Sequence, residues 1–226
     1  IMTLLGDRRD AAEDREAVVG GILPSVNNAL SLVLDAGRGM LAVAGGHFPV
    51  AAGGQYELFS IKELFRKKDA WHGSHASPRR QKPAAGEAIR CYNAAWQAWF
   101  ERGDRERALR LLNDGGALVP EEPAFPRMSG LLHMKGGDWE WAVRDLKRAL
   151  ALETVAGGRQ AETGLWLARA LDCAGRREEA VSRYDAVAAL DPAGTWGRQA
   201  ARGARRPWRR SQGHRIRVEF VTSTAE

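Results

Sequence analysis

The sequence predicts a mainly α-helical fold, in which an array of helix-turn-helix hairpins follows a small α+β segment with a β-hairpin. The first observation is a repeat: Gly103, Gly137 and Gly175 stand 34 and 38 residues apart, and an alanine follows each of them five residues later. The second is a pair of short apolar runs on either side of an Asp/Gly turn, Asp35 to Arg38. The third is that no apolar run approaches the length that spans a bilayer.

The repeated stretch, residues 87–192, divides into three helix pairs. The alanines after the glycines are Ala108, Ala142 and Ala180, and a large side chain follows each of them four residues later. Small residues suit places where two helices cross closely, and large apolar residues fill the space beside them. This layout resembles the tetratricopeptide (TPR) repeat, whose period is 34 residues. The resemblance implies three TPR repeats, with a longer second interval and a departure at Trp96, where the TPR pattern has glycine.

The TPR resemblance also implies a binding surface, because the first helices of stacked pairs line a concave groove. Aromatic, methionine and basic side chains in such a groove suit an extended peptide that carries apolar anchors and some acidic groups. The function implied is a noncatalytic protein-interaction module, or scaffold, that binds a protein or peptide partner. The residues placed in the groove are Arg90, Asn93 and Gln97 from the first repeat, Arg127, Met128, Leu131 and Lys135 from the second, and Glu162, Trp166 and Arg169 from the third.

One alternative is that some of these residues belong to the core. Met128, Leu131 and Trp166 can instead pack against the N-terminal segment as ordinary buried side chains.

The same residues also bear on the kind of ligand. The Lys/Asn/Arg clamp of chaperone-binding TPR domains is not matched, since Met128 and Glu162 stand at two of its places. A chaperone C-terminus is therefore not the expected partner.

Residues 1–66 form the predicted α+β segment. Leu32 and Val33 put apolar side chains on opposite faces of one strand, which predicts cover on both sides of it. About 65 residues provide little cover of their own. The expected elements are a helix over residues 1–21 closed by Gly20-Gly21, a hairpin of strands at 29–34 and 40–44, and a third strand at 56–61.

This segment brings a second resemblance. The runs Leu4-Leu5-x-Asp7-Arg8-Arg9-Asp10, Asn27 to Asp35 and Tyr56-Glu57-Leu58-Phe59 look like the C-terminal end of penicillin-acyltransferase-type N-terminal-nucleophile hydrolases. The resemblance implies late strands of a four-layer αββα fold and a chain that is the end of a longer amide hydrolase or acyltransferase. The nucleophile of that family is an N-terminal cysteine, whereas this chain has Ile1 there. The chain itself is therefore expected not to be an enzyme.

Residues 67–86 are rich in polar and helix-breaking residues and predict a linker. His72 and His75 lie in it, but two histidines without a third and fourth ligand do not make a zinc site, so solvated histidines and no metal are expected. His133 is expected to be a packed polar tip. Gly157-Gly158 lacks the Lys-Ser/Thr pair of a phosphate-binding loop, and no cofactor is predicted. Other possible ligand or catalytic residues are one histidine and two cysteines. His47 is expected to be another packed polar tip, and Cys91 and Cys173 are expected to be small buried hydrophobic side chains.

The net charge of +6 belongs entirely to residues 193–226, which contain eight arginines and two glutamates. A capping helix is expected around Trp196, Ala200 and Ala204, followed by a basic tail. Three interpretations of the tail stay open: nucleic-acid contact through arginines and Trp208, a disordered tail, or a product of a shifted reading frame in GC-rich DNA. Because the folded body is neutral, nucleic acid is an unlikely partner for the repeats. A cytoplasmic location without membrane contact is expected, and nothing in the pattern indicates an oligomeric state.

Overall fold

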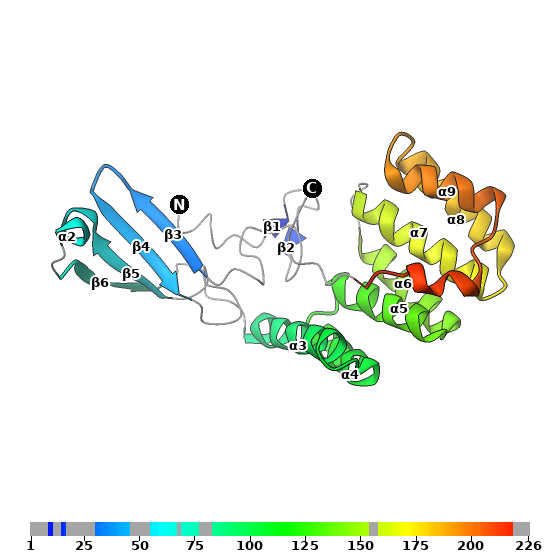
Figure 1. The fold of residues 1–226 in the computed structure, drawn as a ribbon, viewed down its shortest axis with the longest axis horizontal. Coiled ribbons are helices and arrows are strands. Elements are labelled where there is room, and N and C mark those ends of the chain that lie inside the picture. The colour runs from blue at the N-terminus through cyan, green and yellow to red at the C-terminus, as the bar shows by residue number, and fades with distance from the viewer. Residues whose placement is uncertain are drawn as a thin grey trace. The chain divides into compact units, whose positions relative to one another are not determined.

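The computed structural model of the chain is mainly helical, and a small antiparallel sheet precedes the helices (Figure 1). The chain divides into two compact units, with residues up to Arg90 in the first and Cys91–Phe220 in the second. The residues that the structure describes are 9–10, 15–16, 30–45, 55–66, 69–76, 83–153 and 158–218.

The first unit contains a four-stranded antiparallel sheet in the order β3-β4-β5-β6. The predicted hairpin is confirmed, because β3 and β4 pair along their whole length. At the turn, the Asp35 carboxylate accepts a hydrogen bond of 3.0 Å from the main-chain N–H of Arg38, and Gly39 takes a φ of 64° that favours glycine. The elements are β3 (Leu30–Asp35), β4 (Met40–Gly45), β5 (Gln55–Ser60), the short helix α2 (Ile61–Phe65) and β6 (Trp71–Ala76).

Only one face of this sheet is buried among the described residues. Val33, Ala42 and Tyr56 form a small core on that face. On the opposite face Leu32 and Leu34 remain 55% and 60% exposed. The cover predicted on both sides of the first strand is therefore not found for these two leucines.

Two predictions for the first unit are wrong where the structure describes it. The linker predicted over 67–86 contains β6, whose Trp71 donates an indole hydrogen bond of 2.6 Å to the Glu57 carboxylate across the sheet. The helix predicted over 1–21 is contradicted at β1 (Arg9–Asp10) and β2 (Arg15–Glu16), which pair as antiparallel strands. The rest of that predicted helix lies outside the described residues. Strand β6 depends on its pairing with β5, so local composition did not reveal it.

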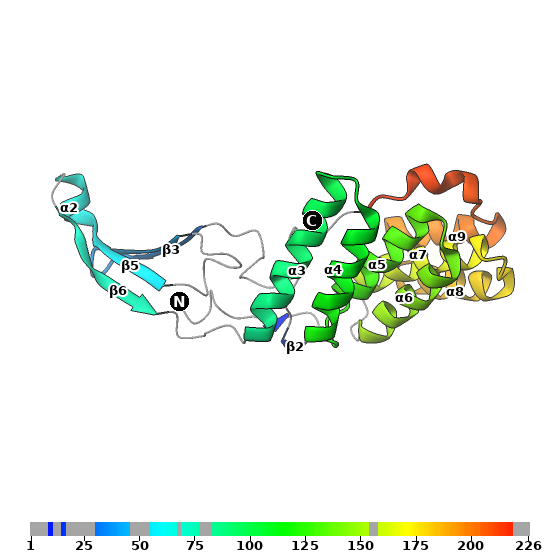
Figure 2. The same ribbon diagram turned by 90° about the horizontal axis from the view of Figure 1, so that it is seen from below.

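Six helices occupy the repeated stretch, as its period predicts (Figure 2). Helices of successive pairs contact each other: α4 contacts α5, and α6 contacts α7. The first helices of the second and third pairs, α5 and α7, are also in contact. The helices are α3 (Pro83–Phe100), α4 (Arg105–Leu118), α5 (Ala124–Gly136), α6 (Trp139–Leu152), α7 (Gly158–Cys173) and α8 (Arg177–Leu190).

The repeated glycines end the first helix of each pair. Gly103, Gly137 and Gly175 have φ values of 65°, 83° and 82°, in the left-handed region that side chains with a Cβ rarely adopt. The residue after each glycine then donates its N–H to a carbonyl in the last turn of the preceding helix. In the first pair Asp104 also begins the next helix, because its carboxylate accepts a hydrogen bond of 2.9 Å from the N–H of Arg107.

The repeated alanines all belong to the buried core. Ala108, Ala142 and Ala180 are fully buried. Gly130 lies at a close approach, because a Cβ added there would stand 2.6 Å from Cγ of Leu146 on α6. A small residue at Gly130 lets the backbones of α5 and α6 approach each other.

A further helix, α9 (Thr195–Arg205), covers the end of the array and contacts α8 and α7. The Asp191 carboxylate, which lies before the helix, accepts main-chain hydrogen bonds of 3.0 Å from Trp196 and Gly197 in its first turn. A 3₁₀ helix, η2 (Arg210–Arg215), follows, and Ile216 is buried. A helix is thus present where the sequence analysis expects one around Trp196. The interpretation of the residues after it as a disordered tail is not supported for residues 206–218, which contain η2 and the buried Ile216.

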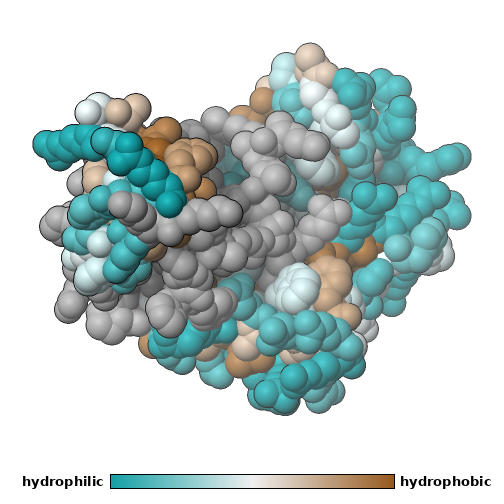
Figure 3. Space-filling view, turned by 60° about the vertical axis from the view of Figure 1, so that its left-hand side comes forward, coloured by the Kyte–Doolittle hydropathy of each residue, from teal (hydrophilic) through white to brown (hydrophobic). Residues whose placement is uncertain are grey.

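Among the described residues on the face drawn in Figure 3, hydrophobic residues form small patches between hydrophilic ones. None of the helices in the described part of the chain combines the length and the apolar character needed to cross a membrane.

Candidate functional site

The chain after α9 turns back and lies against α7 and α5, where it is drawn in red in Figures 1 and 2. We call residues 206–218 the C-terminal segment. Its main chain is held at both ends. Near the start, the Trp208 N–H donates a hydrogen bond of 2.7 Å to the Asp172 carboxylate. Near the end, the Ile216 carbonyl accepts one of 3.1 Å from Nζ of Lys135.

Asp172, near the end of α7, is the most deeply buried residue that binds the C-terminal segment. Its side chain is fully buried, yet both carboxylate oxygens have donors. Oδ2 accepts from the Tyr184 hydroxyl at 2.9 Å as well as from Trp208, and Oδ1 accepts from Arg177 at 2.9 Å. Burial, together with the Asp172 charge, raises the pKa of the Tyr184 phenol well above its usual range. Such donors compensate the cost of burying a carboxylate, so this group is fixed in position.

Cys173, the next residue, also contacts the C-terminal segment. Its carbonyl accepts a hydrogen bond of 2.9 Å from Nε of Arg210, and its thiol lies 3.9 Å from the Trp208 carbonyl. Burial, with a smaller contribution from the Asp172 charge, raises the pKa of the thiol to about 11. The thiol is therefore protonated at neutral pH and acts as a weak hydrogen-bond donor.

An arginine lies between two indole rings at the centre of the contact. The guanidinium carbon of Arg169 is 4.5 Å from the ring centroid of Trp166 and 4.2 Å from that of Trp208. The two indoles meet edge to face at 6.4 Å. Burial lowers the pKa of Arg169 to about 10, which leaves it charged at neutral pH. Each cation–π contact of this kind contributes about 0.5–2 kcal/mol.

The predicted groove residues divide into groups. Lys135, Trp166 and Arg169 contact the C-terminal segment. Arg127 and Glu162 form an ion pair of 3.5 Å with each other. The remaining predicted residues are Met128 and Leu131, which are buried, Asn93, which is half-buried, Gln97, which is exposed, and Arg90, which is exposed and paired with Glu87 on its own helix.

Sequence reasoning missed Asp172, Cys173 and the role of Trp208. Asp172 and Cys173 follow Arg169 by three and four residues, which places them on the same side of α7. Extending the predicted face by one turn would have found both. Trp208 carried no such indication, because it is 36 residues from the carboxylate that it contacts.

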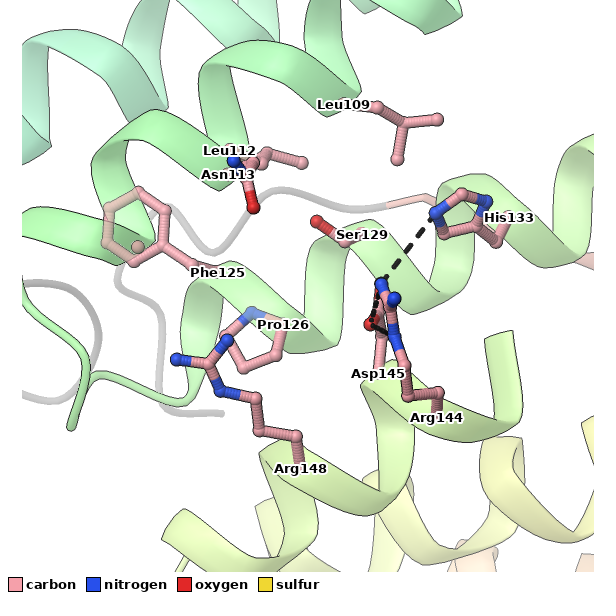
Figure 4. Close-up of a pocket in the computed structure, with 11 residues that line it drawn as sticks. Leu109, Leu112, Asn113, Phe125, Pro126, Ser129, His133, Arg144, Asp145 and Arg148 are labelled. Carbon is pink, nitrogen blue, oxygen red and sulfur yellow. Dashed lines mark hydrogen bonds and ion pairs between the residues drawn. The ribbon is translucent and has the colours of Figure 1, made fainter. Parts of the chain in front are cut away.

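A second candidate is a cavity of about 100 Å³ between α4, α5 and α6, drawn in Figure 4. His133 lies at its edge, with Nδ1 3.5 Å from Asp138 and Nε2 3.7 Å from Asp145. Asp145 is in turn paired with Arg144 at 2.7 Å. Ser129 also lines the cavity, but in the described part of the chain no hydrogen bond joins it to His133. The histidine is held by two aspartates as a packed polar group, and a nucleophile–base pair is not formed.

The histidines of the predicted linker do not gather ligands either. His72 pairs with Glu63 at 3.3 Å, and the side chain of His75 is outside the described set. Within the described ranges, no three His, Cys, Asp or Glu side chains come together as a metal site.

Neither a known protein-family model nor a characterised protein matches this chain in sequence.

Proposed function

We propose that the helical array is a TPR-type, noncatalytic interaction module that binds an extended peptide on the face of α5 and α7. One observation carries the proposal: this face already holds a stretch of polypeptide, the C-terminal segment, whose backbone is extended at Arg209 and Ile216 on either side of η2. Lys135, Trp166 and Arg169, which the TPR resemblance places in the groove, are among the side chains that contact it.

The chemistry of the contact supports a peptide ligand rather than a small molecule. Lys135 and Asp172 bind a main-chain carbonyl and a main-chain N–H, groups that every peptide offers. The Trp166–Arg169 pair adds a place for an aromatic ring, which supplies affinity and selectivity. Main-chain contacts with a single aromatic anchor are typical of short-peptide recognition.

The helix arrangement supports the TPR part of the proposal. The left-handed turns at Gly103, Gly137 and Gly175 recur in the register that the repeat predicts. Buried alanines recur five residues later. The contacts α4 to α5, α6 to α7 and α8 to α9 link each pair to the next, as stacking of repeats requires.

The proposal is tested by selecting peptides from a random 12-residue display library on the full chain. Selected peptides should lose about tenfold or more in affinity when Lys135 or Trp166 is replaced by alanine, because each removes an anchor of the contact. Lys135 is exposed, so Lys135→Ala leaves the fold intact.

Matched controls exist on α6. Lys147→Ala removes the same charge, and Trp141→Ala the same ring, from exposed positions of another helix. Both controls should bind like the unaltered chain. Selection of no peptide, or peptides whose affinity falls equally in the control variants, would place the function elsewhere.

A further inference from the structure

The C-terminal segment uses the same side chains that the proposed function assigns to a partner. Lys135, Trp166 and Arg169 each contact it. A partner peptide on this face would therefore meet a surface that residues 206–218 already cover. The question is whether this segment is a permanent part of the core or an exchangeable ligand.

Several of its contacts are those of a ligand. Trp208 is half-buried, and Arg210 and Lys135 are exposed. The principal polar contacts go to main-chain groups or come from them, at Trp208, Cys173 and Ile216. Contacts of this kind, at partly exposed positions, open more readily than a packed helix does.

The fit of the segment is also incomplete. Nε1 of Trp208 is buried and has no hydrogen-bond partner among the described residues. A buried indole N–H without an acceptor weakens binding, so a partner whose own chain offers an acceptor to its tryptophan at this place binds more tightly than the C-terminal segment. The segment therefore occupies the face without being its best ligand.

The tether compensates for this imperfect fit. The C-terminal segment follows α9 directly, and α9 is itself packed on α8 and α7. A short connection of this kind holds a segment at an effective concentration on the order of millimolar, so even a weak ligand stays bound.

We propose that residues 206–218 are an intramolecular occupant of the peptide site, and that the partner is an extended segment of the same chemistry, with a tryptophan beside arginines and an aliphatic residue farther along. This inference rests on the proposed function. The partner binds by displacing the C-terminal segment, and its apparent affinity is reduced by the fraction of chains in which the face is covered. If nine chains in ten are covered, the apparent Kd rises about tenfold.

The test uses the full chain and a labelled synthetic peptide with the sequence of Arg206–Val218 as the probe. The release variant carries Trp208→Ala and Ile216→Asp, which remove the indole anchor and the buried aliphatic side chain. The matched control carries Arg206→Ala and Ser211→Ala, two exposed positions of the same segment. A scrambled peptide of equal charge corrects for non-specific attraction.

The release variant should bind the probe about tenfold more tightly than the unaltered chain, and the control variant should equal the unaltered chain. A second measurement needs no peptide. Alkylation of Cys173, followed by mass spectrometry, should accelerate in the release variant and slow again when the probe is added, because the segment covers this thiol. Circular dichroism verifies that the helices are retained.

The outcomes separate this inference from the function on which it rests. Equal probe affinity in all three chains, with unchanged alkylation of Cys173, overturns the intramolecular occupant. If the release variant fails to bind the probe while library-selected peptides still depend on Lys135, the inference falls and the proposed function stands. If neither the probe nor any selected peptide binds, both fall.

Discussion

At the scale of single residues, the end of α7 places a buried carboxylate next to a buried thiol. Asp172 is a carboxylate whose oxygens are all engaged, and Cys173 is a thiol kept in its protonated form. Both face the C-terminal segment through Trp208. Because the thiol is buried beside a negative charge, its ionisation reports how well this site is closed.

The first prediction concerns the reactivity of this thiol with pH. With a pKa of about 11, Cys173 should be about a hundredfold less ionised at pH 8 than a thiol of pKa 9, and its alkylation should accelerate up to about pH 11. The folded state holds the proton more tightly than the unfolded state, so the free energy of unfolding should fall as pH rises from about 9 to about 11. Iodoacetamide kinetics with mass-spectrometric mapping measures the rate.

The same chain unfolded in urea supplies the reference, since Cys173 should react there at the ordinary rate of an exposed thiol. Alkylation of Cys173 in the folded chain at that ordinary rate, at pH 8, would show that the thiol is open to water and the segment is not in place.

At the scale of elements, two glycines of the α5 region, Gly130 and Gly137, are needed for different physical reasons. Gly137 ends α5 in a left-handed conformation, and open space surrounds the position of a Cβ. Gly130 lies inside the same helix with ordinary geometry, but a Cβ would stand 2.6 Å from the Leu146 side chain. The first glycine is needed for its backbone and the second for its size.

The second prediction follows from this difference. Gly137→Ala should lower the free energy of unfolding by about 1–2 kcal/mol, and Gly137→Asn by less, because asparagine tolerates the left-handed conformation. At Gly130 the order should reverse, with alanine less damaging than the larger asparagine, since the cost there is overpacking of about 1–3 kcal/mol. Urea unfolding followed by circular dichroism measures all four variants. The same order at both sites would refute the distinction.

The elements that the sequence predicted are those set by local constraints. The turn at Gly137 needs only its own backbone, and the burial of Ala142 follows from its spacing after that turn. The strand β6 was missed because Trp71 is held by Phe59 and Glu57, partners that the local composition does not reveal.

The candidate site divides in the same way. Lys135 and Arg169 could be predicted because the TPR resemblance implies that the first helices of successive pairs line one face. That the C-terminal segment covers this face could not be predicted. The contact of Trp208 with Asp172 joins residues 36 apart, and it depends on the direction that the chain takes after α9. No periodic pattern encodes that direction.

At the scale of the molecule, the helical unit is closed at its C-terminal end by α9. The fit is close, since a Cβ at Gly203 would stand 2.4 Å from the Tyr184 ring on α8. Arg177 binds the carbonyls of Gly203 and Ala204 at the end of the same helix, at 3.0 and 2.5 Å. Repeat arrays require such a cover, because their last pair otherwise exposes an apolar face.

The last prediction compares two shortened chains. A chain that ends at Pro192 loses α9 and with it the cover of Tyr184 and the carbonyl acceptors of Arg177, so its helical unit should lose about 3 kcal/mol or more of stability. For a unit of this size, that loss lowers the melting midpoint by about 10 °C. A chain that ends at Arg206 keeps those contacts and loses those of the C-terminal segment, so its midpoint should fall much less. Thermal unfolding followed by circular dichroism at 222 nm, which reports the helical signal, measures both midpoints.

If the two chains melt together, well below the full chain, the C-terminal segment is part of the core, and its exchange for a partner peptide would be excluded. If the chain ending at Pro192 melts like the full chain, α9 is not the cover that its contacts indicate.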